Sequence, residues 1–162
     1  MRVRIETPGD RPAVFDVHAA AFPTDAEARL VDRLRADGDL VLSLVADDGG
    51  AIVGHVAFSA MQAPFRALGL APVAVLPPRQ QSGIGAALIR AGLEQATREN
   101  WNAVFVLGDP DYYERFGFSV PLASGFMCRY AGPHFMARPL QGPALACANG
   151  PIAYASAFDM LG

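Results

Sequence analysis

The order of apolar runs in the middle of the chain restricts its possible folds more than any other sequence feature. Residues 68–76 form an apolar run that ends at Pro77-Pro78, and residues 103–107 form a second, shorter one. Between them, residues 82–99 carry apolar side chains at the spacing of a helix. A strand, a turn, a helix and a strand in this order predict a βαβ unit, whose two strands are parallel and joined by a right-handed crossover.

Two helices are predicted before this unit, after a short first strand at residues 2–6. Asp10 can cap the first helix, which runs to about Phe22. The second helix begins with a capping box at residues 24–27, in which the Thr and Glu side chains each accept a hydrogen bond from a free backbone amide. Gly38 ends this helix, since glycine readily adopts the left-handed conformation that follows a helix C-terminus.

A hairpin is predicted between these helices and the βαβ unit. Residues 40–46 and 51–60 read as strands, and the turn Asp47-Asp48-Gly49-Gly50 joins them. The two strands should therefore be antiparallel, which makes the complete sheet a mixed one.

The segment after the βαβ unit is rich in Pro and Gly and predicts shorter elements. Residues 111–116 suit a short helix, residues 117–120 a strand, and residues 135–140 and 152–158 two strand-like pieces. No internal repeat or linker divides the chain. We therefore expect one α+β domain over residues 1–162, with helices flanking a mixed, mostly antiparallel central sheet.

Composition and charge exclude several classes of function. Of the 162 residues, 52% are hydrophobic, the formal net charge is −3, and the 13 Lys and Arg are scattered along the chain. No basic stripe could follow a nucleic-acid backbone, and no apolar stretch reaches the roughly 18 residues of a membrane span. No apolar segment of signal-peptide length follows the first residues, so we expect a cytoplasmic protein without nucleic-acid or membrane partners.

The cysteines and histidines predict no metal site. Cys128 and Cys147 lack the spacing of metal ligands and are expected to be reduced, packed thiols. The three histidines, His18, His55 and His134, have no Cys, Asp or Glu partner at ligand spacing.

The turn at Gly83 and Gly85 is a candidate phosphate-binding site. Both glycines lie between a strand end and a helix start, where free amide hydrogens and the helix dipole favour an anion. A tight strand-to-helix turn without a ligand is the alternative. No P-loop motif occurs, and Leu88 occupies the third glycine position of the dinucleotide-binding motif, so neither nucleotide-binding fold fits.

The pattern Gln80-x-x-Gly83-x-Gly85 after a Pro-terminated strand resembles the Gcn5-related N-acetyltransferase (GNAT) superfamily. The resemblance extends over most of the first 120 residues in element order. It implies acetyl-CoA as cosubstrate and a strand, residues 73–77, that splays from its parallel neighbour. The cofactor-binding residues that it implies are Val73, Ala74 and Val75 for the acetyl-pantetheine end, and Gln80, Gln81, Ser82, Gly83, Ile84, Gly85 and Ala86 around the pyrophosphate. Arg79 could assist a phosphate or remain a solvated loop side chain.

A second segment, Tyr113-Glu114-Arg115-Phe116-Gly117-Phe118, resembles the family's Y-E-K-x-G-F segment. There the tyrosine precedes the glycine by four residues, which selects Tyr113 rather than Tyr112 as the general acid. A phenol with an ordinary pKa of about 10 is protonated near neutrality and can give its proton to the departing CoA thiolate. Many family members carry a cofactor-contacting asparagine near the position of Asp109. The surrounding residues are most similar to a bacterial branch of predicted acetyltransferases, the YhbS type.

We therefore expect an N-acetyltransferase that moves an acetyl group from acetyl-CoA to a primary amine by direct attack in a ternary complex. No nucleophile elbow or activated cysteine suggests an acyl-enzyme. Glu27 and His55 are candidate bases, but a capping box explains Glu27 better, and a histidine in a strand is more often hydrogen-bonded in place than catalytic. A non-catalytic acyl-CoA-binding module and a structural domain are the alternatives. The segment after Leu122 could line the acceptor site or form a homodimer contact.

Overall fold

The computed structural model describes residues 1–161, in which a six-stranded mixed sheet forms the centre. The strand order is β1-β2-β3-β4-β5-β7, and every neighbouring pair is antiparallel except β4 and β5. This confirms the predicted α+β fold with a mostly antiparallel sheet and one parallel pair. The strands are β1 (Arg2–Ile5), β2 (Leu40–Asp48), β3 (Ala51–Ala60), β4 (Ala67–Val75), β5 (Ala103–Leu107) and β7 (Phe135–Pro139), with β6 (Phe126–Met127) and β8 (Gly150–Pro151) paired in a separate small sheet.

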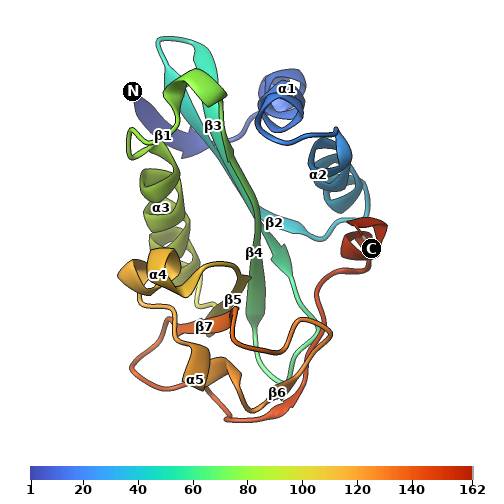
Figure 1. Cartoon of the computed structure of the whole chain (residues 1–162), viewed down its shortest axis with the longest axis vertical. Helices are drawn as coiled ribbons and strands as arrows, with labels where there is room; N and C mark the ends of the chain where they lie inside the picture. The colour runs from blue at the N-terminus through green and yellow to red at the C-terminus, as the bar shows by residue number, and fades with distance from the viewer. Residues whose placement is uncertain (162) are drawn as a thin grey trace.

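The main helices cover the two faces of the sheet. Helix α3 packs on one face, and α1 and α2 lie on the other, where the C-terminal segment η4 also packs beside α2 (Figure 1). The helices are α1 (Arg11–Ala21), α2 (Ala26–Ala36), α3 (Ile84–Arg98), α4 (Pro110–Tyr113) and α5 (Val120–Ala123), with 3-10 turns η1 (Pro8–Asp10), η2 (Pro77–Arg79), η3 (Glu114–Phe116) and η4 (Ser156–Leu161).

Strand β3 runs through the middle of this core and serves both faces. Val56 and Phe58 are fully buried in the cluster that includes α3. His55 points to the other face, where it meets His18 of α1. Side chains alternate between the two faces along a strand, and helices cover both faces of this sheet. Most side chains of β3 are therefore buried, and most of them are apolar.

Two predicted strands near the C-terminus are wrong. Residues 117–120 do not form one, because Ser119 accepts a hydrogen bond from the amide of Leu122 at 3.3 Å and so starts the short helix α5. Residues 152–158 do not either. Their apolar side chains Ala157 and Phe158 belong to η4 and pack with Leu30 and Leu34 of α2, so this run covers a helix and does not extend the sheet.

Two predicted helix caps are also wrong, although both helices form. The Asp10 carboxylate binds Arg4 at 2.7 Å and the amide of Thr7 at 2.8 Å, and it caps no amide of α1. The Arg4 guanidinium holds the pKa of Asp10 well below its usual range. Helix α2 begins one residue later than the capping box requires, so Glu27 lies too early to reach back to the N-cap amide.

Gly92 allows α3 to lie close to β3. A Cβ atom on Gly92 would lie 2.1 Å from Cε1 of Phe58. We expect Gly92→Ala to lower the free energy of unfolding by about 2 kcal/mol, because overpacking costs more than the gain in helix propensity. Urea denaturation measures the effect. The additional substitution Phe58→Leu should recover part of the loss, and an unchanged midpoint for Gly92→Ala would contradict this packing.

Candidate active site

The parallel strands β4 and β5 separate part-way along their length. They pair only from Ala67 to Gly69, although β4 continues to Val75. On its other side β4 stays paired with β3 to Val75, with a β-bulge opposite residues 56–58 of β3. Because a bulge bends a strand, it accounts for the divergence. An opening therefore lies between the second half of β4 and β5.

The backbone of β4 presents polar groups to this opening. Leu76 donates its amide to the carbonyl oxygen of Val53 in β3 at 2.9 Å. Because hydrogen bonds alternate along an antiparallel strand, the amides of Val75 and Val73 point the other way, into the opening. The Gln80 side chain donates to the carbonyl oxygen of Val75 at 3.0 Å, which fixes the end of β4 to the following turn.

The glycine turn joins this opening to the start of α3. Gln81 and Gly83 adopt left-handed conformations, with φ of 62° and 87°, so the chain turns sharply before α3 begins at Ile84. The first amides of α3 have no acceptor within the helix and point out of its N-terminus. A Cβ on Gly83 would meet no atom within 4 Å, which leaves space for a ligand.

A cavity of about 470 Å³ lies at this junction. Nine of the ten cofactor-binding residues expected from the sequence line it, and Ser82 does not, because its hydroxyl donates to the carbonyl oxygen of Arg79. Arg79 lines the cavity while it binds Asp48 at 2.8 Å, so it is not a free loop side chain. The lining residues are Val73, Ala74, Val75, Arg79, Gln80, Gln81, Gly83, Ile84, Gly85, Ala86, Tyr112 and Arg115.

Of the two adjacent tyrosines, Tyr112 lines the cavity and the expected acid, Tyr113, does not. The Tyr112 hydroxyl would lie 3.7 Å from a Cβ on Gly85 at the start of α3. Tyr113 packs against Gly108 at the end of β5, where a Cβ would lie 2.4 Å from its ring. Burial, with a smaller contribution from Tyr112, raises the pKa of Tyr113 to about 12. Tyr113 therefore remains protonated throughout the neutral range.

Sequence reasoning missed Tyr112 and Arg115 as cavity residues. The guanidinium of Arg115 stacks over the Tyr112 ring at 4.6 Å and its Nε donates to the Tyr112 carbonyl oxygen at 2.8 Å. A spacing of three residues on a helical turn permits this contact, but exposed arginines at that spacing are common. Asp109 does not line the cavity and instead caps α4 by accepting from the amide of Asp111 at 3.0 Å.

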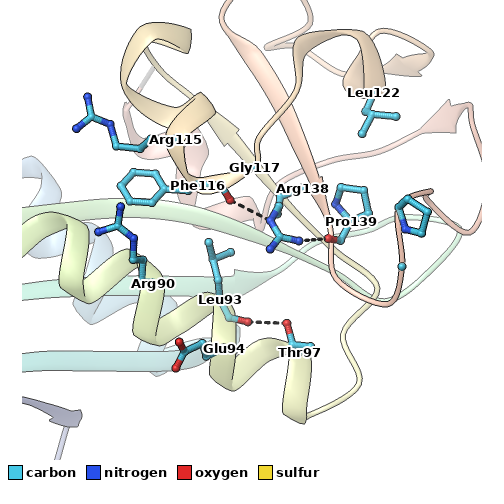
Figure 2. A pocket seen from close by; sticks show the side chains of 12 residues that line it. Arg90, Leu93, Glu94, Thr97, Arg115, Phe116, Gly117, Leu122, Arg138 and Pro139 are labelled. Atoms are coloured by element: carbon cyan, nitrogen blue, oxygen red, sulfur yellow. Dashed lines mark hydrogen bonds between the residues drawn. The ribbon is translucent and has the colours of Figure 1, made fainter.

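A larger cavity of about 590 Å³ lies beside this site, between α3 and β7. Figure 2 shows Arg90, Arg115 and Arg138 around it, with Glu94 at its edge. Arg138 is held in place because its Nε donates to the carbonyl oxygen of Phe116 at 2.9 Å. Arg115 borders both cavities, so the positive charge extends from the glycine turn along α3.

A buried histidine pair lies on the face opposite α3. Nε2 of His18 lies 2.8 Å from Nδ1 of His55, and Nε2 of His55 lies 2.7 Å from the hydroxyl oxygen of Ser43. Burial lowers the pKa of His18 to about 4. Burial, followed by the charges of His18 and Arg35, lowers that of His55 well below 6.5. Both ring nitrogens of His55 are therefore hydrogen-bonded to side chains within the core.

Glu27 lies at the start of α2, half-buried, without a hydrogen bond or ion pair within residues 1–161.

Among the described residues, 1–161, no three His, Cys, Asp or Glu side chains gather where they could hold a metal ion. Among the described helices, none combines the length and the apolar character needed to cross a membrane.

A sheet opened between two parallel strands, with a glycine turn at the head of the crossover helix, defines an N-acetyltransferase fold. The chain belongs to the acetyltransferase (GNAT) family, whose model matches residues 11–118. It is 37% identical to the uncharacterized N-acetyltransferase YhbS of Escherichia coli strain K12 over 98% of this chain and 99% of that protein.

Solved structures agree with this assignment. The crystal structure of Escherichia coli YhbS in complex with CoA is similar with a TM-score of 0.92 at 35% identity, covering 99% of this chain and 93% of that one. A GNAT-family acetyltransferase of Brucella melitensis in complex with acetyl-CoA has a TM-score of 0.83 at 37% identity, covering 98% and 97% of the two chains.

Proposed function

We propose that this protein transfers the acetyl group of acetyl-CoA to a primary amine by direct attack in a ternary complex. The observation that carries the proposal is the cavity that joins the glycine turn to the opened strand β4. Free amides at the head of α3 suit the pyrophosphate, and the outward amides of β4 suit the pantetheine arm. The CoA and acetyl-CoA complexes of the two similar proteins support this choice of cosubstrate.

The reaction needs a donor for the oxyanion and a proton for the leaving sulfur. The neutral amine attacks the thioester carbonyl, a C–N bond forms, and the oxygen takes up negative charge that the Val75 amide can stabilise. The C–S bond then breaks, and the Tyr113 hydroxyl gives its proton to the thiolate. The amine loses its extra proton to water, and Tyr113 is reprotonated from solvent.

Tyr113 suits the acid role better than Tyr112 because the Tyr112 hydroxyl lies beside the glycine turn. Tyr112 is beside Gly85, at the end where phosphate binding is expected. Tyr113 packs against Gly108, three residues beyond Phe105, the last residue of β5 that pairs with β4. A thiol at the far end of the pantetheine arm would therefore approach Tyr113.

A non-catalytic acyl-CoA-binding module is the second candidate. It would use the same cavity and would bind acetyl-CoA without releasing CoA in the presence of any amine. The protonated, half-buried Tyr113 favours turnover, because binding alone needs no proton donor at the thiol end. Thiol release in an amine screen distinguishes the two candidates.

The first experiment is isothermal titration with acetyl-CoA and with CoA. We expect saturable binding by the wild type and at least tenfold weaker binding by Gly83→Glu, because the new carboxylate lies among the amides that bind phosphate. Gly49→Glu is the matched control. Gly49 also has a positive φ, of 63°, and also has nothing within 4 Å of a Cβ, but it lies in the β2–β3 turn. A folded wild type that binds neither compound would overturn the proposal.

A further inference from the structure

The cavity between α3 and β7, called here the arginine cavity, concentrates positive charge. Arg90, Arg115 and Arg138 line it together with a single carboxylate, that of Glu94 (Figure 2). Within residues 1–161, none of these three arginines forms an ion pair with Glu94 or with any other carboxylate. Guanidinium groups around one cavity repel one another, and an anion bound among them removes this repulsion.

Two aromatic rings orient the guanidinium groups of Arg90 and Arg115. The Arg90 guanidinium carbon lies 5.0 Å from the centroid of the Phe116 ring, and that of Arg115 lies 4.6 Å from the centroid of the Tyr112 ring. Stacking uses the face of a guanidinium plane and leaves the N–H donors at its edge free. Of these donors, only Nε of Arg115 has an acceptor in the described part of the chain. The others can bind an anion, and their planar fork suits a phosphate.

The arginine cavity adjoins the phosphate end of the proposed cofactor site. Arg115 lines both this cavity and the one at the glycine turn. Arg90 lies about two turns, or about 10 Å, along α3 from its N-cap Gly83, and side chains on a helix lean toward its N-terminus. With the pantetheine arm along β4 and the pyrophosphate at the head of α3, the nucleotide of CoA continues away from β4. A single ribose separates the pyrophosphate from the 3′-phosphate, which therefore lies close to this part of α3.

We propose that Arg90 and Arg115 bind the 3′-phosphate of CoA, so that the enzyme selects CoA thioesters over the corresponding thioesters of dephospho-CoA. The inference rests on the proposed function and adds two specificity-determining residues to it. Arg138, whose Nε is held by the carbonyl oxygen of Phe116, adds positive charge from β7. The contact is remote from the thioester, so it is measurable with CoA itself, without an acetyl group or an acceptor amine.

The test is isothermal titration with CoA and with dephospho-CoA, which lacks only this phosphate. The wild type should bind CoA about tenfold more tightly, the effect of hydrogen bonds between charged groups at a partly exposed site. Arg90→Gln should bind CoA about fivefold more weakly than the wild type and keep its affinity for dephospho-CoA within about twofold. Arg115→Gln should also reduce the preference for CoA, and the double substitution should abolish it. Both arginines are exposed, so neither substitution should unfold the protein.

Arg98→Gln is the matched control. Arg98 is also an exposed arginine of α3, but it does not line the arginine cavity, and it donates to the side-chain oxygen of Gln95 at 2.6 Å. We expect this substitution to leave both affinities within about twofold, since salt screens a distant exposed charge. Equal wild-type affinities for CoA and dephospho-CoA, or an equal loss of both in Arg90→Gln, would overturn this inference and leave the proposed function intact. A wild type that binds neither compound would overturn both.

Discussion

Replacing Tyr113 by Phe should lower kcat by about 10²- to 10³-fold and leave the affinity for acetyl-CoA within about twofold, as expected when a general acid is removed. The pKa of about 12 keeps the phenol protonated throughout the neutral and mildly alkaline range. Without the Tyr113 hydroxyl, the CoA thiolate must leave unprotonated. The substitution therefore slows the chemical step, and the rate of CoA thiol release under saturating acetyl-CoA measures the fall in kcat.

Tyr112→Phe is the control for this prediction. Tyr112 shares the short helix α4 and the aromatic contact with Phe116, but its hydroxyl faces Gly85. We expect it to leave kcat within about threefold, because it removes no proton donor from the thiol end. Equal kcat values for the wild type and Tyr113→Phe would exclude Tyr113 as the acid. A large fall confined to Tyr112→Phe would transfer the role to that residue.

Acidification from pH 7.5 to pH 4 should lower the free energy of unfolding by about 3 kcal/mol through His18 alone. Its folded pKa of about 4 lies below the unfolded value of 6.5, so the unfolded chain binds the proton more tightly. The stabilisation is therefore complete above about pH 6.5 and is lost as the pH falls toward 4. His55, with a pKa lowered in the same direction, adds to the effect. Urea denaturation at several pH values measures it.

His18→Gln should reduce this pH dependence, because glutamine stays neutral over the whole range. His134→Gln should not, since His134 is exposed in the segment before β7. The paired carboxylates of Asp10 and Asp47 have pKa values lowered from 3.8, so the stability that they contribute is lost as the pH falls below about 3.8, and they account for little of a loss above pH 4. A wild type equally stable at pH 7.5 and pH 4.5 would contradict the neutral, buried pair.

The elements with a strong local cause could be predicted from the sequence. Proline and glycine mark both ends of the turn at residues 77–85, and periodic apolar residues mark α3, so the βαβ unit was predictable from spacing. The cofactor-binding residues came from the resemblance to the GNAT superfamily. The hairpin turn at Gly49 and Gly50 was predictable for the same reason, and both glycines have positive φ.

The parts that depend on distant contacts were not predictable. The Asp10 carboxylate could cap α1 or bind Arg4. It binds Arg4, whose position depends on the register of β1 with β2. The run at residues 152–158 reads as a strand, yet its apolar residues pack on α2, more than a hundred residues earlier. The contact of Tyr154 with Gly69 could not be predicted either, because Gly69 lies on β4, far from Tyr154 in sequence.

The place of β7 in the sheet has a consequence for synthesis. Strand β5 pairs with β4, made earlier, and with β7, made about thirty residues later. A nascent chain that has reached only α5 therefore exposes the edge of β5 and the face that Phe135 covers. Such an edge can pair with another chain. Aggregation should accordingly be greatest among translation products that stop between α5 and β7, since only the segment that contains β7 completes the sheet.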